Sequence, residues 1–267
     1  MIDVDCGGFV AGTAGTVGTG SIDDLAGIAD ICSRSPDRLW FHVDGAIGAV
    51  ARFSPRLRPL LAGLERADSV AFDLHKWLSV PYECGCILVR DAQMHKQTFA
   101  KPSASYLTFM DGGVAPSDET YFSDYTLELS RNAKALKVWM LFKTYGIEKY
   151  GKIMEQSINQ TKYLIKLIRS HPKELELLTK SKLNIVCFRY RSANASIQSW
   201  NVFNKKLLVK IQEDGIAIVS PYAVKNDVFA LRVFIGNHRT KRSDLEWFIR
   251  KLLIIARELL PVEEFYI

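Results

Sequence analysis

The chain has 267 residues, of which 48% are hydrophobic and 24% charged, and its mean hydropathy is +0.01. This composition is typical of a globular protein and excludes a disordered chain, a collagen-like repeat and a coiled coil. No apolar run approaches the roughly 20 residues of a membrane span, and the N-terminus lacks the basic-then-apolar order of a signal peptide. We therefore expect a cytoplasmic protein without a membrane partner.

The net charge of +6 comes from the C-terminal part of the chain. Residues 1–150 contain 15 Lys and Arg against 18 Asp and Glu, whereas residues 151–267 contain 20 against 11. The basic residues are spaced as on a solvated helix face, and no nucleic-acid-binding motif accompanies them. We therefore expect no nucleic-acid partner.

The five cysteines are scattered along the chain, without the paired spacing of a zinc site or a disulfide framework. They are Cys6, Cys32, Cys84, Cys86 and Cys187. We expect all five to be reduced and structural, and we expect no metal site.

The first part of the chain alternates short apolar runs with helical patterns. We expect strands at residues 9–14, 39–43, 69–73 and 86–89, and helices at residues 22–32 and 57–66. Strands that alternate with helices through short loops indicate a mostly parallel, covered sheet. Residues 101–125 are rich in Ser, Gly, Pro and Asp, and a stretch of that length without regular structure is typical of a lid or a disordered segment.

Two long helical patterns follow, at residues 127–145 and 147–169. Beyond them the pattern predicts strands at residues 185–190, 217–219 and 229–235, and helices at residues 199–213 and 245–260. We therefore expect an α/β fold with two domains. Residues 1–144 form part of a large domain with a mostly parallel sheet, and residues 145–267 form a small α+β domain.

Chemically versatile side chains follow two of the predicted strands. Asp44 comes directly after the strand at residues 39–43, and His75 and Lys76 come just after the strand at residues 69–73. In open α/β sheets, ligands bind beyond the carboxyl ends of the strands, so both segments are expected at one crevice. The alternative is that Asp44 caps a turn and Lys76 is an ordinary surface lysine.

These segments resemble the group II pyridoxal-phosphate-dependent decarboxylases, which include the glutamate and aromatic amino acid decarboxylases. The matching blocks keep the family's order, and they lie at residues 12–16, 20–23, 42–46, 67–69, 73–77, 129–131, 135–137, 184–188 and 231–233. The resemblance implies the fold type I architecture of pyridoxal-phosphate-dependent transferases, similar to aspartate aminotransferase. It covers the C-terminal portion of such an enzyme.

The resemblance also implies a site for pyridoxal 5'-phosphate. Lys76 matches the lysine that forms the Schiff base, and Asp44 matches the carboxylate that pairs with the pyridine nitrogen and keeps the ring an electron sink. Ala46 matches a small residue against one face of the ring, and Thr16 matches a region near the ring oxygen. His75 matches a histidine within reach of cofactor or substrate; the alternative is a structural histidine bonded to the backbone.

Tyr106 matches the tyrosine of the family's mobile loop that returns a proton to the carbon that has lost CO2; the alternative is an exposed loop tyrosine. The chain departs from the family at two positions. Val17 stands where many members have a second threonine, and Asp73 stands where many have an asparagine near the cofactor phosphate, so we assign Asp73 no phosphate role. Arg131 is expected to anchor the start of a helix.

The implied function is a pyridoxal-phosphate-dependent carboxy-lyase that acts on an amino acid. Family members carry an upstream segment with the phosphate-binding turn and a histidine that stacks on the ring, and neither has a counterpart here. We therefore expect the chain to need a partner, either as a homodimer or with a separate N-terminal half. The alternatives are another enzyme of the same cofactor class, an aminotransferase or carbon–sulfur lyase, and an inactive remnant that serves as a dimerising module.

Overall fold

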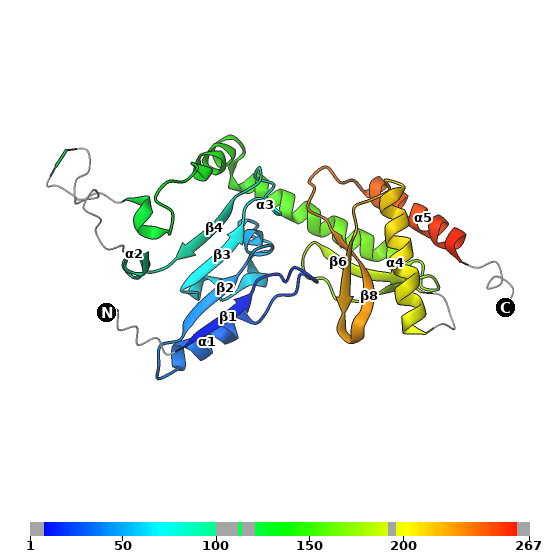
Figure 1. The fold of residues 1–267 in the computed structure, drawn as a ribbon, viewed down its shortest axis with the longest axis horizontal. Coiled ribbons are helices and arrows are strands. Elements are labelled where there is room, and N and C mark those ends of the chain that lie inside the picture. The colour runs from blue at the N-terminus through cyan, green and yellow to red at the C-terminus, as the bar shows by residue number, and fades with distance from the viewer. Residues whose placement is uncertain (1–7, 100–111, 114–120, 192–195, 261–267) are drawn as a thin grey trace.

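The structure is a computed structural model that describes residues 8–99, 112–113, 121–191 and 196–260, and within them it contains two four-stranded sheets (Figure 1). The first sheet has the order β1-β2-β3-β4, formed by Phe9–Thr13, Trp40–Asp44, Ser69–Asp73 and Gly85–Val89. Its first three strands are parallel, and β4 runs antiparallel to β3. The second sheet is antiparallel with the order β5-β6-β8-β7, formed by Leu175–Leu177, Ile185–Tyr190, Val228–Phe234 and Ser220–Val224. The expected α/β fold is confirmed.

Five α-helices belong to the described part of the chain. They are α1 (Leu25–Arg34), α2 (Ala92–Phe99), α3 (Lys134–Arg169), α4 (Ile197–Glu213) and α5 (Arg242–Leu259). Short 3-10 helices are η1 (Ala49–Phe53), η2 (Arg58–Leu61), η3 (Leu64–Arg66), η4 (Phe122–Tyr125) and η5 (Lys225–Asp227). Within the described residues, no helix is apolar over enough of its length to cross a bilayer.

Several predicted elements are wrong, and local backbone chemistry explains the clearest case. Residues 57–66 form η2 and η3 instead of one helix, because Pro59 stands at the start of η2 and Gly63 adopts a left-handed φ of 96° between them. The residue at position 63 has to be glycine, since a Cβ there would lie 2.4 Å from the backbone nitrogen of Ala26.

The remaining differences concern the ends of elements and two short elements. Helix α3 begins at Lys134 and not at residue 127, and the predicted break between residues 145 and 147 is confirmed as an interruption at Gly146, where the backbone leaves the helical conformation. The strand expected at residues 217–219 lies at Ser220–Val224. The apolar pattern missed β5 and α2, because β5 has three residues and none of the side chains of α2 is buried.

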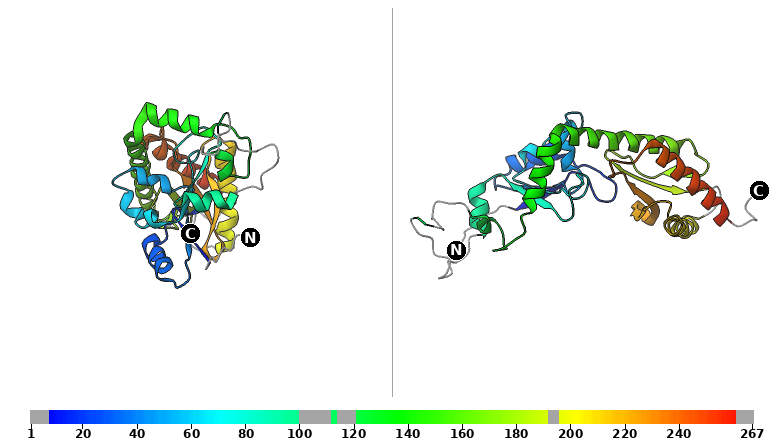
Figure 2. Two further views of the ribbon diagram at one scale, coloured as in Figure 1. Left: turned by 90° about the vertical axis from the view of Figure 1, so that its left-hand side faces the viewer. Right: turned by 90° about the horizontal axis from the view of Figure 1, so that it is seen from above.

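Helix α3 runs along both sheets and joins them into an elongated molecule (Figure 2). The core of the first sheet, which contains Phe41 and Trp77, also contains Tyr150, Met154 and Ile158 of α3. The core of the second sheet takes the later part of α3, beginning at its buried Leu164. The domain division at residue 145 stays a prediction.

The two faces of the first sheet differ in how they are covered. Phe41 and Val43 are buried on the face that carries the core, although Leu88 at the edge of that face is 58% exposed, whereas the opposite face exposes 64% of Phe9 and 54% of Ile87. The strand register places Phe9, Trp40 and Ile87 on this same open face. Parallel strands are ordinarily covered on both faces, so this surface is available to a further layer of polypeptide.

Candidate active site

The carboxyl ends of the three parallel strands lie side by side at one edge of the first sheet. Thr13 of β1 pairs in register with Asp44 of β2, which pairs with Ala71 of β3. Backbone hydrogen bonds continue beyond the strands, from Ala14 N to Asp44 O at 2.8 Å and from Asp73 N to Ala46 O at 3.3 Å. The sheet therefore brings the segment of Asp44 and the segment of Lys76 together, as the sequence predicts.

Asp44 is the last residue of β2 and its side chain is exposed. Its Oδ1 accepts a hydrogen bond from the backbone N–H of Ala46 at 3.1 Å, so Asp44 does cap its own turn. A carboxylate offers about four acceptor positions, so this bond does not exclude a second partner. The turn also places the small, half-buried Ala46 directly beside the carboxylate.

Lys76 lies in the turn that follows β3 and forms an ion pair with Asp73. Its Nζ is 2.6 Å from Asp73 Oδ2, and the two side chains are 37% and 25% exposed. Leu74 and Trp77, on either side of this turn, are buried in the core, which fixes the chain from which Lys76 projects. The lysine is thus a partly shielded, paired amine at the sheet edge and not a free surface lysine.

His75 is anchored to the backbone of the next loop. Its Nδ1 accepts a hydrogen bond from the Cys84 N–H at 3.0 Å, and its ring meets the Tyr82 ring edge to face at 4.6 Å between centroids. Because Nδ1 is the acceptor, the proton of the neutral ring resides on Nε2, which is left as a donor. His75 therefore has the expected structural bond and also a second nitrogen able to donate.

The start of α3 holds the loop that carries Tyr82 and Glu83. Lys137 Nζ donates to Pro81 O at 2.8 Å and to Glu83 O at 2.7 Å, and Lys134 Nζ lies 2.6 Å from Glu83 Oε1. The ion pair lowers the pKa of Glu83 and raises that of Lys134. The block at residues 135–137 matched the family in the sequence, but only the structure shows that its lysine supports the loop beyond Lys76.

Thr16 lies in the turn that follows β1, and its hydroxyl closes this turn. Its Oγ1 accepts a hydrogen bond from the Ser21 N–H at 3.1 Å and is 3.0 Å from Thr19 Oγ1.

Two further residues predicted from the sequence lie away from these strand ends or outside the described residues. Arg131 lies before α3 and forms an ion pair with Glu128 at 3.3 Å. Tyr106 lies outside the described residues, so its role stays a prediction.

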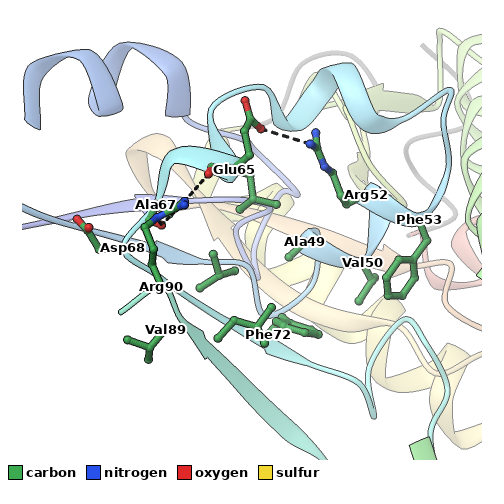
Figure 3. Close-up of a pocket in the computed structure, with 13 residues that line it drawn as sticks. Ala49, Val50, Arg52, Phe53, Glu65, Ala67, Asp68, Phe72, Val89 and Arg90 are labelled. Atoms are coloured by element: carbon green, nitrogen blue, oxygen red, sulfur yellow. Dashed lines mark hydrogen bonds and ion pairs between the residues drawn. The ribbon is translucent and has the colours of Figure 1, made fainter. Parts of the chain in front are cut away.

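An apolar cavity of about 450 Å³ lies elsewhere on the first sheet (Figure 3). Val70, Phe72 and Leu88 line it, and these side chains point to the face of the sheet opposite that of Ala71. Arg90 closes its rim by donating from Nε to Ala67 O at 3.0 Å. The cavity lies between this face of β3 and β4 and the segments of η1 and η3, and it is separate from the site at the strand ends.

The side chains at the strand ends suit part of pyridoxal phosphate. An exposed carboxylate at Asp44 fits the ring nitrogen, and a primary amine at Lys76 fits the aldehyde. For the phosphate, the described residues of this site provide two carboxylates, Asp44 and Asp73, a lysine that is already paired, and the Nε2 donor of His75. The carboxylates would repel a phosphate, so phosphate-binding groups beyond His75 are needed, which agrees with assigning Asp73 no phosphate role.

Comparison with known proteins identifies the family. The profile of the pyridoxal-dependent decarboxylase conserved domain matches residues 6–191. The chain belongs to the pyridoxal-dependent decarboxylase family. This confirms the resemblance found in the sequence, and with it the family's cofactor, pyridoxal phosphate.

Individual relatives agree with the family match. The chain is 34% identical over 251 residues to an aromatic-L-amino-acid decarboxylase of Bacillus atrophaeus, covering 94% of this chain and 51% of the relative. It is 30% identical over 237 residues to a histidine decarboxylase of Rattus norvegicus, covering 89% and 34%. The crystal structure of Oryza sativa TDC with PLP and tryptamine matches with a TM-score of 0.85 at 26% identity, covering 95% of this chain and 51% of that one. The family match and this structural match confirm the expected fold type I, and the chain spans about half the length of such relatives or less.

Proposed function

We propose that this chain serves in the pyridoxal-phosphate-dependent decarboxylation of an amino acid, with Lys76 as the residue that binds the cofactor covalently. The observation that carries the proposal is the arrangement at the sheet edge, where the paired amine of Lys76 lies beside the turn of Asp44. The family match supports the reaction class.

The candidate residues have the following proposed roles. The amine of Lys76 attaches the cofactor, Asp44 binds its ring nitrogen, and Ala46 leaves space for the flat ring. His75 donates from Nε2, and Tyr106 delivers a proton to the carbon that loses CO2. The bound cofactor supplies a ring that accepts the electrons left when CO2 departs.

The open face of the first sheet supports a proposal about partners. The phosphate needs more donors than the Nε2 of His75, and Phe9 and Ile87 offer an apolar surface for more polypeptide. We propose that a second copy of the chain or a separate N-terminal half completes the site. The substrate is proposed only as an amino acid.

Covalent trapping tests the role of Lys76. The chain is titrated with pyridoxal phosphate, alone and with the N-terminal half of the Bacillus relative, then reduced with borohydride and mapped by peptide mass spectrometry. We expect the label on Lys76 and its loss in Lys76→Ala. Lys210→Ala is the matched control, because Lys210 also has a carboxylate partner at 2.6 Å, Asp214, but lies on α4.

Two results would contradict the proposal. The first is a label spread over surface lysines and unaffected by Lys76→Ala. The second is exchange of the amino group without release of CO2 by the reconstituted protein, which would make it an aminotransferase. Release of CO2 from carboxyl-labelled amino acids supports a decarboxylase.

A further inference from the structure

We propose that Arg232 of β8 is a positioning residue that holds the turn of Thr16, residues 15–20, in place beside the candidate cofactor site. One of its two tests, the measurement of cofactor binding, rests on the proposed function; the other does not. It assigns a role to the second sheet, which supplies none of the residues placed at the strand ends.

The guanidinium of Arg232 binds the turn directly. Its Nε donates to Val17 O at 2.8 Å and to Gly18 O at 3.1 Å, and its Nη1 donates to Ser220 Oγ at 3.0 Å. Burial lowers the pKa of Arg232, and the carbonyl oxygens of the turn compensate for its lost hydration. Hydrogen bonds from a charged donor are stronger than those between neutral groups, so these contacts hold the turn firmly.

Two further side chains of the second sheet reach the same turn. Cys187 Sγ donates to Gly18 O at 3.4 Å, and the Tyr222 ring packs on Gly18 so closely that a Cβ there would lie 2.2 Å from Tyr222 Cζ. Cys187, Arg232 and Ser220 stand opposite one another on β6, β8 and β7. Three adjacent strands thus present one surface to one turn.

Backbone hydrogen bonds close this turn and join it to the segment that carries Asp44. The turn is closed by the N–H groups of Gly15 and Thr16, which both donate to Ser21 O, at 3.1 and 2.9 Å. Directly before the turn, Ala14 N donates to Asp44 O at 2.8 Å, and Gly48 N donates to Ala14 O at 3.0 Å. A shift of the turn is therefore transmitted to the backbone of Asp44 and of Gly48, which follows it.

Hydrogen–deuterium exchange of the turn tests this role without any cofactor. In Arg232→Gln we expect the amides of residues 15–21 to exchange about tenfold faster or more, the factor expected for losing a hydrogen bond to a charged group. Arg232→Lys should give an intermediate result, because one ammonium cannot reproduce the fork of donors. Arg191→Gln is the control, since Arg191 lies just beyond the end of β6 and pairs with Glu176.

Cofactor binding provides the second measurement. We expect Arg232→Gln to weaken pyridoxal phosphate binding about three- to tenfold and to change the visible circular dichroism of the bound cofactor, with the melting temperature close to that of Arg191→Gln. Unchanged exchange in residues 15–21 would overturn the proposal, even if activity falls. A wild-type chain that binds no cofactor with the N-terminal half supplied would refute the proposed function and leave the exchange result standing.

A second pair of variants covers the case in which Arg232→Gln does not fold. Gly18→Ala should push the turn away from the Tyr222 ring and speed exchange in the same residues. Adding Tyr222→Leu removes the ring atoms that the new Cβ would meet and should restore slow exchange. A double variant that exchanges as fast as Gly18→Ala alone would contradict the packing part of the proposal.

Discussion

Asp73 and Lys76 form an ion pair within one turn of the chain, at 2.6 Å and with both side chains partly exposed. Partly exposed pairs of this kind contribute about 0–1 kcal/mol, because water competes for both charges. Asp73 can therefore orient the amine at the end of β3 and still release it for the bond to the cofactor aldehyde that we propose for Lys76. A neutral asparagine at this position could not bind the ammonium as strongly.

The thiol of Cys187 leads to a prediction about pH. Burial raises the pKa of this thiol, so the folded chain keeps its proton above the ordinary thiol pKa of about 8.5 while the unfolded chain loses it. The unfolded state then binds fewer protons, and the free energy of unfolding falls as the pH rises above that value, by at most about 1.4 kcal/mol per pH unit for one group.

Urea denaturation at pH 8 and pH 10 measures this effect. Cys187→Ala should lower the free energy of unfolding at both values but reduce the difference between them. An identical difference in the wild type and the variant would show that other groups, such as the buried Tyr150, whose pKa is also raised by burial, account for the pH dependence.

At the scale of the elements, α3 is interrupted at one residue, Gly146. Gly146 has a φ of 73° and a ψ of 156° inside this helix, where the helical pattern of the sequence also broke. This backbone conformation is open to glycine and strained for other residues. It separates the first turns of α3 from the part, beginning at Tyr150, that packs first against the first sheet and then against the second.

Gly146→Ala is therefore expected to destabilise the protein by about 1–3 kcal/mol through backbone strain alone. A Cβ at this position meets no atom within 4 Å, so steric overlap does not contribute. The measurement is urea denaturation with far-ultraviolet circular dichroism. If the variant gains stability, as a glycine-to-alanine change in a regular helix does, the interruption at Gly146 is absent from the folded protein.

At the scale of the whole molecule, two sheets are coupled by α3 and by the contact between Arg232 and the turn of Thr16. The second sheet is buried against α4 and α5. The first sheet keeps one face open, with exposed apolar side chains on its edge strands β1 and β4. Free edges and apolar faces of this kind pair with other chains.

Ile87→Lys tests whether this open face governs association. We expect weaker binding of a hydrophobic dye and less self-association in light scattering, with little loss of stability because 54% of the side chain is exposed. Ile31→Lys on α1 is the matched control, since Ile31 is 65% exposed but lies outside the sheet face. Equal effects of the two changes would mean that general surface polarity, and not this face, controls association.

Much of the first sheet and of the candidate site could be predicted from the sequence. The strands Ser69–Asp73 and Ile185–Tyr190 lie where the apolar pattern placed them, because each apolar run ends at polar residues. The helix at residues 57–66 failed because Gly63 needs a left-handed backbone to approach α1, which a pattern of apolar residues does not record.

The sequence by itself determined the family, the α/β class and the position of Asp44, His75 and Lys76 after parallel strands, since these follow from local patterns and short motifs. Only the tertiary structure showed that Lys137 supports the loop beyond Lys76 and that Arg232 binds the turn of Thr16. Lys137 and Arg232 meet partners more than 50 and 200 residues away, and such contacts depend on how the sheets and α3 pack. Pattern and spacing report neighbours along the chain, whereas the support of the site comes from neighbours in space.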